Sequence, residues 1–169
     1  MNWALLSFLL YGSSESSTSN KCGNCKLDYS AVFIDSQEHC LKYIAATSPL
    51  DKAVSICAKE GSRPPVPKNA KENADILDFF LSERAKANKV FPSFALDLND
   101  IKMEGTFVSS TGYKAVYTNW FNNEPDNKNG NENYVTMYLD GTWNDFRPSR
   151  EVSIVCQEVC EQEKDSVSG

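Results

Sequence analysis

One stretch of the chain, residues 118–145, collects side chains that could bind a metal ion. Acidic residues stand there among many Asn and Gly residues. Carboxylates held close together repel one another, so a loop that gathers them usually does so around a cation. A mixed set of carboxylate and amide oxygens suits Ca²⁺, which takes about six to eight such ligands. The stretch therefore predicts a calcium site, and its candidate ligands are Glu124, Asp126, Glu132, Asn144 and Asp145.

An acidic, Asn-rich loop is by composition alone typical of a solvated turn. Three features at defined spacings argue against that alternative: the run Glu124-Pro125-Asp126, the later Glu132, and the run Trp143-Asn144-Asp145. In these motifs the sequence resembles the C-type lectin domain. In that family a Glu-Pro-Asn or Gln-Pro-Asp loop, a later Glu and a Trp-Asn-Asp strand hold one Ca²⁺ that also contacts a sugar.

The resemblance covers roughly residues 22–160 and implies a secreted, calcium-dependent carbohydrate-binding protein. It implies that the same five ligands, Glu124, Asp126, Glu132, Asn144 and Asp145, contact both the ion and two adjacent hydroxyls of the sugar. It also implies a cis peptide bond before Pro125, which proline makes accessible. Each sugar hydroxyl would give a lone pair to the ion, and its O–H would donate a hydrogen bond to a neighbouring ligand side chain.

The expected sugar preference depends on which ligands accept and which donate. Glu124 and Asp126 are both acceptors, so Asn144 is the remaining donor. Galactose-binding members usually add an aromatic platform, and residues 127–133 contain none. Mannose, glucose, fucose or GlcNAc-type glycans are therefore favoured over galactose. Four carboxylates around the ion should also disfavour acidic sugars.

A second, auxiliary Ca²⁺ is also implied by the resemblance. Two of the family's acids at this site are amides here, which should weaken the site. The alternative is that Asp100 and Glu104 are solvated turn residues. The implied ligands are Asp100, Glu104, Asn127, Glu132 and Asn133.

Catalysis finds little support in the sequence. The only histidine, His39, adjoins Cys40, which is expected in a disulfide and not as a nucleophile. Glu124 and Asp126 could in principle serve a glycosidase, but carboxylates chelated to calcium would stay ionised and could not act as acids. The chain is therefore predicted not to be an enzyme. The main alternative is a C-type-lectin-like fold that binds protein, ice or mineral, with calcium structural or absent.

Composition indicates a single exported domain. The chain has 169 residues and a net charge of -6, which argues against nucleic acid as a partner. An apolar run opens it, too short for a membrane span and the right length for a signal peptide; the alternative is a buried N-terminal segment. The expected division is a signal peptide over 1–16, a polar leader over 17–21, the lectin domain over 22–160 and an acidic tail over 161–169.

Six cysteines favour disulfides in an exported chain, although sequence alone cannot choose the pairing. The resemblance implies Cys57 with Cys156, and Cys40 with Cys25 or Cys22. One cysteine then remains for Cys160 or for another subunit, which would give a disulfide-linked homo-oligomer. A four-thiolate zinc site is the alternative, formed by Cys22, Cys25, Cys156 and Cys160. The family's inner pair falls on Tyr134 and Pro148, so that bridge is missing.

Periodicity predicts a mixed α+β fold. One helix should open at Ser48-Pro49, with Ala53, Ile56, Cys57 and Ala58 inside, and stop at Gly61; a second should run from Asn69 or Ala70 to Ala85, with an inner stripe of Ile76, Leu77, Phe80 and Leu81. Asp140-Gly141 is a hairpin signal. Short strands are expected over 94–98, 105–108, 116–118, 134–139 and 152–157.

Overall fold

The computed structural model describes residues 24–88 and 91–159. The predicted signal peptide, polar leader and acidic tail lie outside these ranges, as do Cys22 and Cys160. Within the described residues, no helix combines the length and apolar character needed to cross a membrane.

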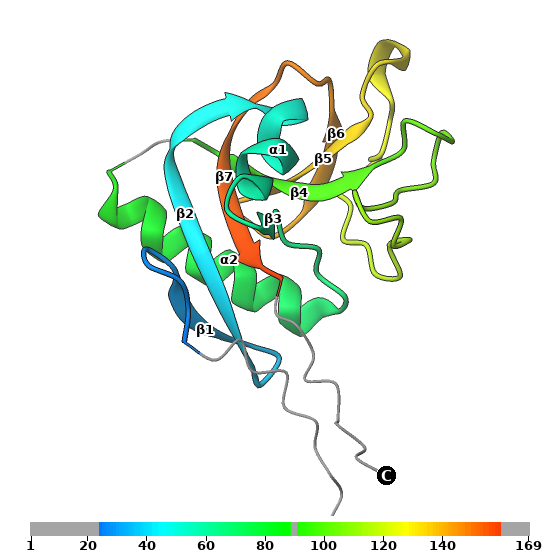
Figure 1. The fold of residues 1–169 in the computed structure, drawn as a ribbon. Helices are drawn as coiled ribbons and strands as arrows, with labels where there is room; N and C mark the ends of the chain where they lie inside the picture. Colours follow the sequence, from blue (N-terminus) through cyan, green and yellow to red (C-terminus); the bar gives the residue numbers. More distant parts are fainter. Residues whose placement is uncertain (1–23, 89–90, 160–169) are drawn as a thin grey trace, which may run out of the picture.

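The strands form one sheet with the order β1-β2-β7-β4-β5-β6, and β3 pairs with β7 (Figure 1). Neighbouring strands are antiparallel except β4 and β7, which run parallel. The predicted α+β class, with two helices on a small, mostly antiparallel sheet, is confirmed. The strands are β1 (Ser30–Ile34), β2 (Gln37–Pro49), β3 (Ser62–Arg63), β4 (Ser93–Asn99), β5 (Tyr134–Tyr138), β6 (Trp143–Phe146) and β7 (Glu151–Glu158).

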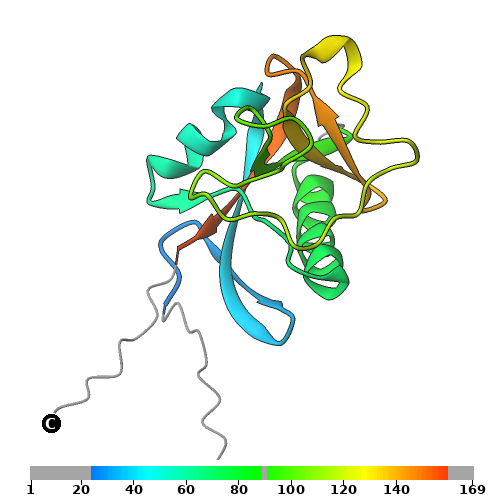
Figure 2. The same cartoon turned by 90° about the vertical axis from the view of Figure 1, so that its right-hand side faces the viewer.

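Two helices lie on opposite faces of the sheet (Figures 1 and 2), and each covers its own apolar cluster. Helix α2 (Ala70–Lys86) contributes Ile76 and Phe80 to the larger cluster, and α1 (Ala53–Ala58) contributes Ala53 and Cys57 to the smaller one. Short 3-10 helices occur at Leu50–Lys52 and Lys128–Gly130.

Helix α2 follows its prediction closely. It begins after Asn69, whose side chain accepts a hydrogen bond from the backbone N–H of Glu72 at 2.9 Å and so caps the first turn. Ile76 and Phe80 are fully buried, and Leu77 and Leu81 are partly buried against the same cluster.

The first helix starts later than predicted. Ser48 and Pro49 end strand β2, where they pair with Val152 and Glu151 of β7. The backbone N–H of the next residue, Leu50, donates to Arg150 at 2.9 Å, so sheet pairing competes with helix formation at this point. Ala58 is exposed, contrary to the expectation that it faces inward.

Three predicted strands, β4, β5 and β7, are present, and Asp140-Gly141 forms the β5–β6 turn. The strands predicted over 105–108 and 116–118 are wrong, since that region forms only isolated bridges, one of them between Asn99 and Val108. The β1–β2 hairpin was not predicted. Its turn uses Asp35 and Ser36, both with positive φ, where a hairpin signal would ordinarily show glycine.

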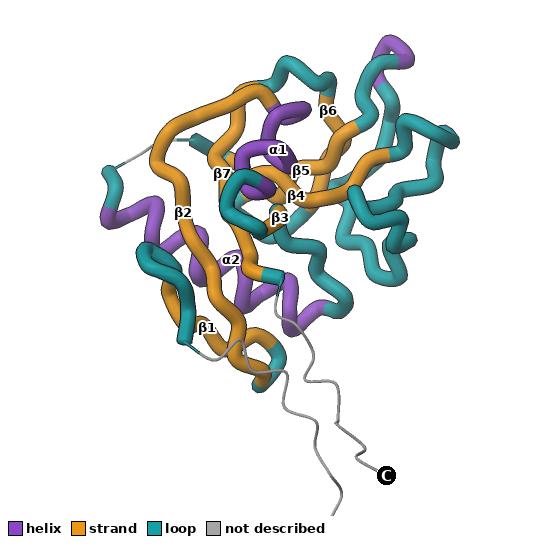
Figure 3. Tube along the Cα trace, in the orientation of Figure 1, coloured by secondary structure: helices purple, strands orange, loops and turns teal. Residues whose placement is uncertain are grey.

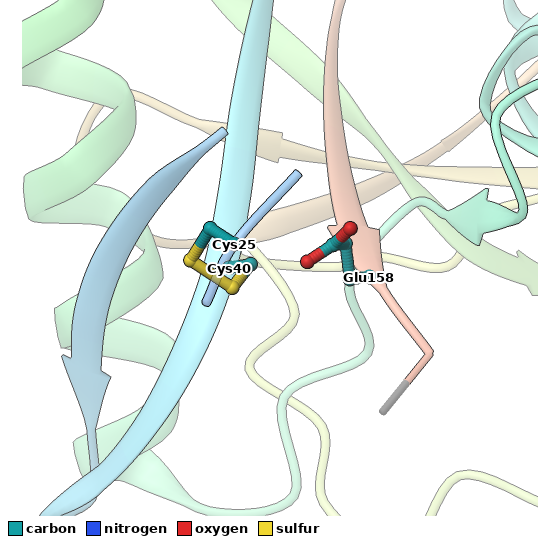
Figure 4. Close-up of side chains that lie close together, drawn as sticks. All are labelled: Cys25, Cys40 and Glu158. Atoms are coloured by element: carbon teal, nitrogen blue, oxygen red, sulfur yellow. A yellow bond between two sulfur atoms is a disulfide. The ribbon is translucent and has the colours of Figure 1, made fainter. Parts of the chain in front are cut away.

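Among the described residues, two disulfides tie distant parts of the chain together. Cys57 of α1 is bonded to Cys156 of β7, as expected, and Cys40 is bonded to Cys25. Figure 4 shows the second bond with Glu158 beside it. The zinc alternative is wrong, because Cys25 and Cys156 are both in disulfides and have no free thiolate to offer a metal.

Regular structure and loop occupy different sides of the molecule. Strands β1, β2 and β7 and both helices fill one side, whereas the chain between β4 and β5, residues 100–133, runs almost entirely as loop on the other (Figure 3). We call this segment the long loop. It carries most of the predicted metal ligands.

Candidate functional site

Three predicted ligands, Glu124, Asp126 and Asp145, come together. Each offers one carboxylate oxygen, and these oxygens lie within 4.8 Å of one another. Asp145 is fully buried on β6, Glu124 is partly buried, and Asp126 is exposed. The peptide bond between Glu124 and Pro125 is cis. Within the described ranges none of the three acids forms a salt bridge, so three like charges share a small volume.

The buried carboxylate of Asp145 fixes the end of the long loop. Its Oδ1 accepts a hydrogen bond from the backbone N–H of Asp126 at 3.2 Å, and its Oδ2 accepts one from Asn127 at 3.0 Å. The backbone N–H of Lys128 then donates to Asp126 Oδ1 at 3.1 Å and to Glu132 Oε2 at 3.2 Å. The loop is therefore shaped by the same acids that are candidates for the ion.

Asn144 contributes the clearest sign of a missing partner. Its Nδ2 donates to the hydroxyl of Tyr138 at 3.0 Å, but its Oδ1 is buried and accepts no hydrogen bond from any residue that the structure describes. A buried acceptor without a partner costs roughly 1 to 3 kcal/mol. A cation held with the neighbouring carboxylates would satisfy this oxygen, so the donor set fits Ca²⁺.

The pKa values of two of the clustered acids, Glu124 and Glu132, are raised. Burial first, and then the carboxylates of Asp126 and Asp145, raise the pKa of Glu124 to about 7. Burial is also the main cause of the raised pKa of Glu132, with Asp145 and Asp126 adding to it. Both pKa shifts reflect first the burial of the carboxyl group and then the negative charge of its neighbours. A divalent cation would reverse them.

The predicted auxiliary ligands also gather. Asn127 donates through Nδ2 to Glu104 and accepts through Oδ1 from the backbone N–H of Glu132. Burial, followed by the charge of Asp100, raises the pKa of Glu104. Asn133 takes part through its carbonyl, which accepts from the backbone N–H of Asp100 at 3.2 Å.

Asp100 is only 2 % exposed, so the alternative of a solvated turn is wrong for this residue. Its Oδ2 accepts from the N–H of Gly105 at 2.9 Å, while its Oδ1 is buried and has no hydrogen-bond partner within residues 24–88 and 91–159. Glu104 is exposed. The orphaned Asp100 oxygen beside Glu104 and Asn127 therefore fits a second cation.

The entrance of the site is fixed by Trp143. This fully buried residue donates through Nε1 to Asn73 of α2 at 2.7 Å, and its backbone N–H donates to the carbonyl of Asn119 at 2.8 Å. The ring of Trp120 packs against both Phe107 and Trp143, with ring centroids 4.8 and 5.8 Å apart. The contacts of Trp143 with helix α2 and with Trp120 thereby position Asn144 and Asp145, the next residues of β6.

Comparison with known proteins assigns this arrangement to a family. Residues 46–158 match the family described as the lectin C-type domain. The chain belongs to the C-type lectin domain family. It is 32% identical over 105 residues to pulmonary surfactant-associated protein D of Bos taurus; the match covers 62% of this chain and 27% of that relative, so the chain spans about a quarter of that relative's length.

Solved structures share the fold. The C-type lectin CEL-I from Cucumaria echinata is 22% identical, with a TM-score of 0.72, and the match covers 82% of this chain and all of CEL-I. A calcium-independent type II antifreeze protein is 16% identical, with a TM-score of 0.66, over 82% of this chain and 96% of that protein. At these identities the likeness shows the fold alone.

The homologues in this family are not enzymes, which agrees with the expectation that this chain is not an enzyme. Membership of the family supports a lectin-like, carbohydrate-binding role for the chain. The disulfides Cys25–Cys40 and Cys57–Cys156 are typical of proteins outside the reducing cytosol.

This lectin domain stabilises the loop without the inner disulfide that its sequence lacks. Tyr134 and Phe146, paired across β5 and β6, pack against the smaller apolar cluster. The carbonyl of Pro148 accepts from the backbone N–H of Asp51 at 3.1 Å. Packing and backbone hydrogen bonds thus hold the segment that follows the Trp-Asn-Asp strand.

Sequence reasoning missed an aromatic row beside Asn144. Phe121, Tyr138 and Phe146 form successive edge-to-face contacts, each with ring centroids 6.2 Å apart, and Arg150 lies over the Phe146 ring. Strand alternation could have indicated part of it, since Asn144 and Phe146 lie on the same face of β6. Phe121 comes from the long loop, however, and its position depends on tertiary structure.

Proposed function

We propose that this lectin domain binds carbohydrate through a Ca²⁺ ion. The ligands would be Glu124, Asp126, Glu132, Asn144 and Asp145. The observation that carries the proposal is the cluster of carboxylate oxygens from Glu124, Asp126 and Asp145, which lie within 4.8 Å of one another. The residue before Asp145, Asn144, adds a buried Oδ1 that has no hydrogen-bond partner among the described residues. When bound, the ion would supply positive charge and open coordination positions for two vicinal sugar hydroxyls.

The chain's own residues orient the sugar. Glu124 and Asp126 can only accept hydrogen bonds from sugar hydroxyls when they are ionised. Asn144 has two N–H groups, and one donates to Tyr138, so the other is left for the sugar. One donor against several acceptors favours a vicinal diol that can donate both its protons.

We favour mannose, glucose, fucose or GlcNAc-type glycans over galactose. Residues 127–133, where a galactose platform is expected, contain no aromatic residue. The aromatic row of Phe121, Tyr138 and Phe146 comes from outside that segment, and it adjoins Asn144 through the hydroxyl of Tyr138. It therefore supports extended contact with a glycan and does not by itself favour galactose.

The second ion is part of the proposal. Asp100, Glu104, Asn127 and Glu132 would hold it, with Asn133 contributing through its backbone. Because Asn127 contacts both Glu104 and the carboxylate of Asp145, an ion here would stabilise the loop that carries the primary ligands. We propose this ion as structural, without contact to the sugar.

The proposed context is extracellular. We propose that residues 1–16 are a signal peptide, that 17–21 form a leader, that the domain spans 22–160 and that 161–169 are an acidic tail. Cys22 and Cys160 would pair with each other or link subunits into a homo-oligomer, which would add the avidity that single sugar sites need. A non-reducing gel distinguishes the two pairings.

A second candidate function is binding of a non-sugar ligand. The antifreeze protein with this fold is calcium-independent, and Asp126 replaces the Asn donor of the Glu-Pro-Asn form. Under this alternative, target binding would persist without calcium. The clustered carboxylates and the orphaned Asn144 oxygen favour the sugar-binding proposal.

The test is retention on mannose-agarose and galactose-agarose in Ca²⁺, followed by elution with EDTA. We expect retention on mannose and release by the chelator. Calorimetric titration with Ca²⁺ at neutral pH should show uptake. No calcium uptake, or sugar binding that continues unchanged in EDTA, contradicts the proposal. Retention on galactose alone contradicts only the sugar preference.

A further inference from the structure

A polar hollow adjoins the proposed sugar site. It has a volume of about 390 Å³ and lies between the tip of the long loop and the segment after β6. Glu132 belongs both to this hollow and to the proposed ligand set, so the two places are neighbours. The residues that line the hollow are Lys128, Asn129, Asn131, Glu132, Phe146, Arg147 and Arg150.

The charge of the hollow is opposite to that of the protein. Three cationic residues face one carboxylate, in a chain whose net charge is -6. In the part of the chain that the structure describes, Lys128, Arg147 and Arg150 form no salt bridge. Cations gathered without acidic partners create a local positive potential that attracts an anion.

Arg150 is held in place before any ligand arrives. Its guanidinium carbon lies 4.6 Å from the centre of the Phe146 ring, a cation–π contact. Its backbone is anchored on both sides, since its N–H donates to Arg147 at 3.1 Å and its carbonyl accepts from Leu50 at 2.9 Å. The side chain therefore loses less freedom on binding than an unsupported surface arginine would.

The same arginine has an unused donor. Its Nε is buried and has no hydrogen-bond partner in the described part of the chain. A buried donor of a charged group that stays unpaired is costly, and a planar guanidinium pairs best with an oxyanion that accepts two bonds. The amides of Asn129 and Asn131 add further donors around the hollow.

We propose that this hollow binds a sulfate or phosphate ester on the glycan whose neutral diol occupies the calcium site. The inference rests on the proposed function and names its substrate class more closely, as an acidic mannose-type glycan. Arg147, Arg150 and Lys128 pair with the ester oxygens, and the Phe146 ring offers an apolar surface to the sugar that carries them.

This inference changes an expectation from the sequence. The four carboxylates of the metal site were expected to disfavour acidic sugars, but that reasoning considered only the ligands of the ion. Two of those charges are offset by a bound Ca²⁺, whereas the three cations of the hollow stay unpaired. An acidic group placed over Arg150 is therefore attracted, although one placed directly over Glu124 and Asp126 is repelled.

The test compares a neutral mannose-type oligosaccharide with its sulfated and phosphorylated counterparts, by calorimetry in Ca²⁺ and at two salt concentrations. We expect the full chain to bind at least one acidic form about tenfold more tightly than the neutral form. The separate sulfate and phosphate arms show which ester is preferred. Added salt should reduce the advantage, because exposed charges are screened.

The variant Arg147→Gln with Arg150→Gln should remove the advantage and leave binding of the neutral oligosaccharide unchanged. The matched control, Lys59→Gln with Lys114→Gln, removes the same charge at exposed positions outside the hollow and should keep the advantage. Thermal unfolding of each variant checks the fold. Arg147→Gln alone, at an exposed position, should reduce the advantage about threefold and serves if the double variant does not fold.

Each contrary outcome has a distinct meaning. If the neutral oligosaccharide binds in Ca²⁺ but neither acidic form binds better, the inference is overturned and the proposed function stands. If acidic forms bind equally well in EDTA, anion binding is independent of the calcium site and the inference is again overturned. If no oligosaccharide binds in Ca²⁺, both the proposed function and the inference fail.

Discussion

The two sides of this molecule are held together by different forces. The side made of strands and helices is stabilised by apolar clusters, such as the one that contains Phe80 and Trp143. Hydrogen bonds between strands and the disulfides Cys25–Cys40 and Cys57–Cys156 add to this stability. In the long loop, acidic side chains such as Asp145 hold the backbone by accepting its N–H groups. Those acids also repel one another. The first side should therefore be stable without a ligand, whereas the second should depend on a cation.

The largest expected effect concerns the regular side. Replacing Cys57 and Cys156 together with alanine opens a link between residues 99 apart in sequence. In the chain-entropy model this lowers the free energy of unfolding by about 4 to 5 kcal/mol. Urea unfolding measures the change, with Cys25–Cys40 kept intact. A loss below about 1 kcal/mol would show that the helix–sheet side does not need this bridge.

The next effect concerns the long loop. Glu124→Gln should lower calcium affinity about 100-fold, because even supporting residues of metal sites cost about 10- to 100-fold when they are removed. It should not destabilise the metal-free protein, since it relieves the repulsion with Asp126 and Asp145. Calorimetry and unfolding measure the two effects. Glu151→Gln, at an exposed position on β7, is the matched control. Equal calcium affinities for the two variants would exclude Glu124 as a ligand.

The stability of the metal-free protein and its affinity for calcium should both depend on pH through Glu124 of the long loop. The folded pKa of Glu124 is raised from 4.5 to about 7, so its protonated form is favoured on folding. This contribution is fully present below about pH 4.5, and the metal-free protein should lose it as pH rises to about 7. Calcium needs the ionised form, so its binding should weaken as pH falls through about 7.

Unfolding measured from pH 4.5 to 8, with and without Ca²⁺, checks this coupling. The stabilisation by Ca²⁺ should grow with pH, and Glu124→Gln should flatten the decline of the metal-free protein. A metal-free protein that becomes steadily more stable over the same range would contradict the assignment of the shift to Glu124.

The smallest expected effect concerns the balance of donors and acceptors. Asp126→Asn adds a donor beside Asn144, so we expect binding of mannose to tighten about threefold relative to galactose. Asp78→Asn, exposed on α2, is the control. Competition with free monosaccharides measures the ratio. An unchanged ratio would show that donor number does not set the sugar preference.

The comparison between the two sides also explains what could be read from the sequence. The clustering of Glu124, Asp126 and Asp145 was predictable because these acids lie in short motifs, Glu124-Pro125-Asp126 and Trp143-Asn144-Asp145. Helix α2 and strands β4, β5 and β7 were predictable because their apolar periodicity is strong. Strands were wrongly assigned to the long loop, where occasional apolar residues imitate a strand pattern but polar side chains determine the course of the backbone.

Other features depend on contacts that no local pattern announces. Asp97 is buried in strand β4, and the sequence alone does not explain how a carboxylate is accommodated there. In the structure its Oδ1 accepts from the backbone N–H of Ser110 at 3.0 Å and its Oδ2 from the hydroxyl of the same residue at 2.7 Å. The cationic hollow was likewise invisible, because Lys128 and Arg150 come from separate segments.

The two ends of the described chain lie close together, at Lys26 and Glu158. These two residues form a salt bridge at 3.4 Å. In Figures 1 and 2 the described chain ends, after β7, well below the turn at Lys128–Gly130, which is drawn in yellow at the top. Either end of the domain can therefore be grafted to a bead, a sensor chip or a scaffold with the recognition loops pointing outward. Many copies fixed in this orientation would present their recognition loops to the same glycan-coated cell surface at once.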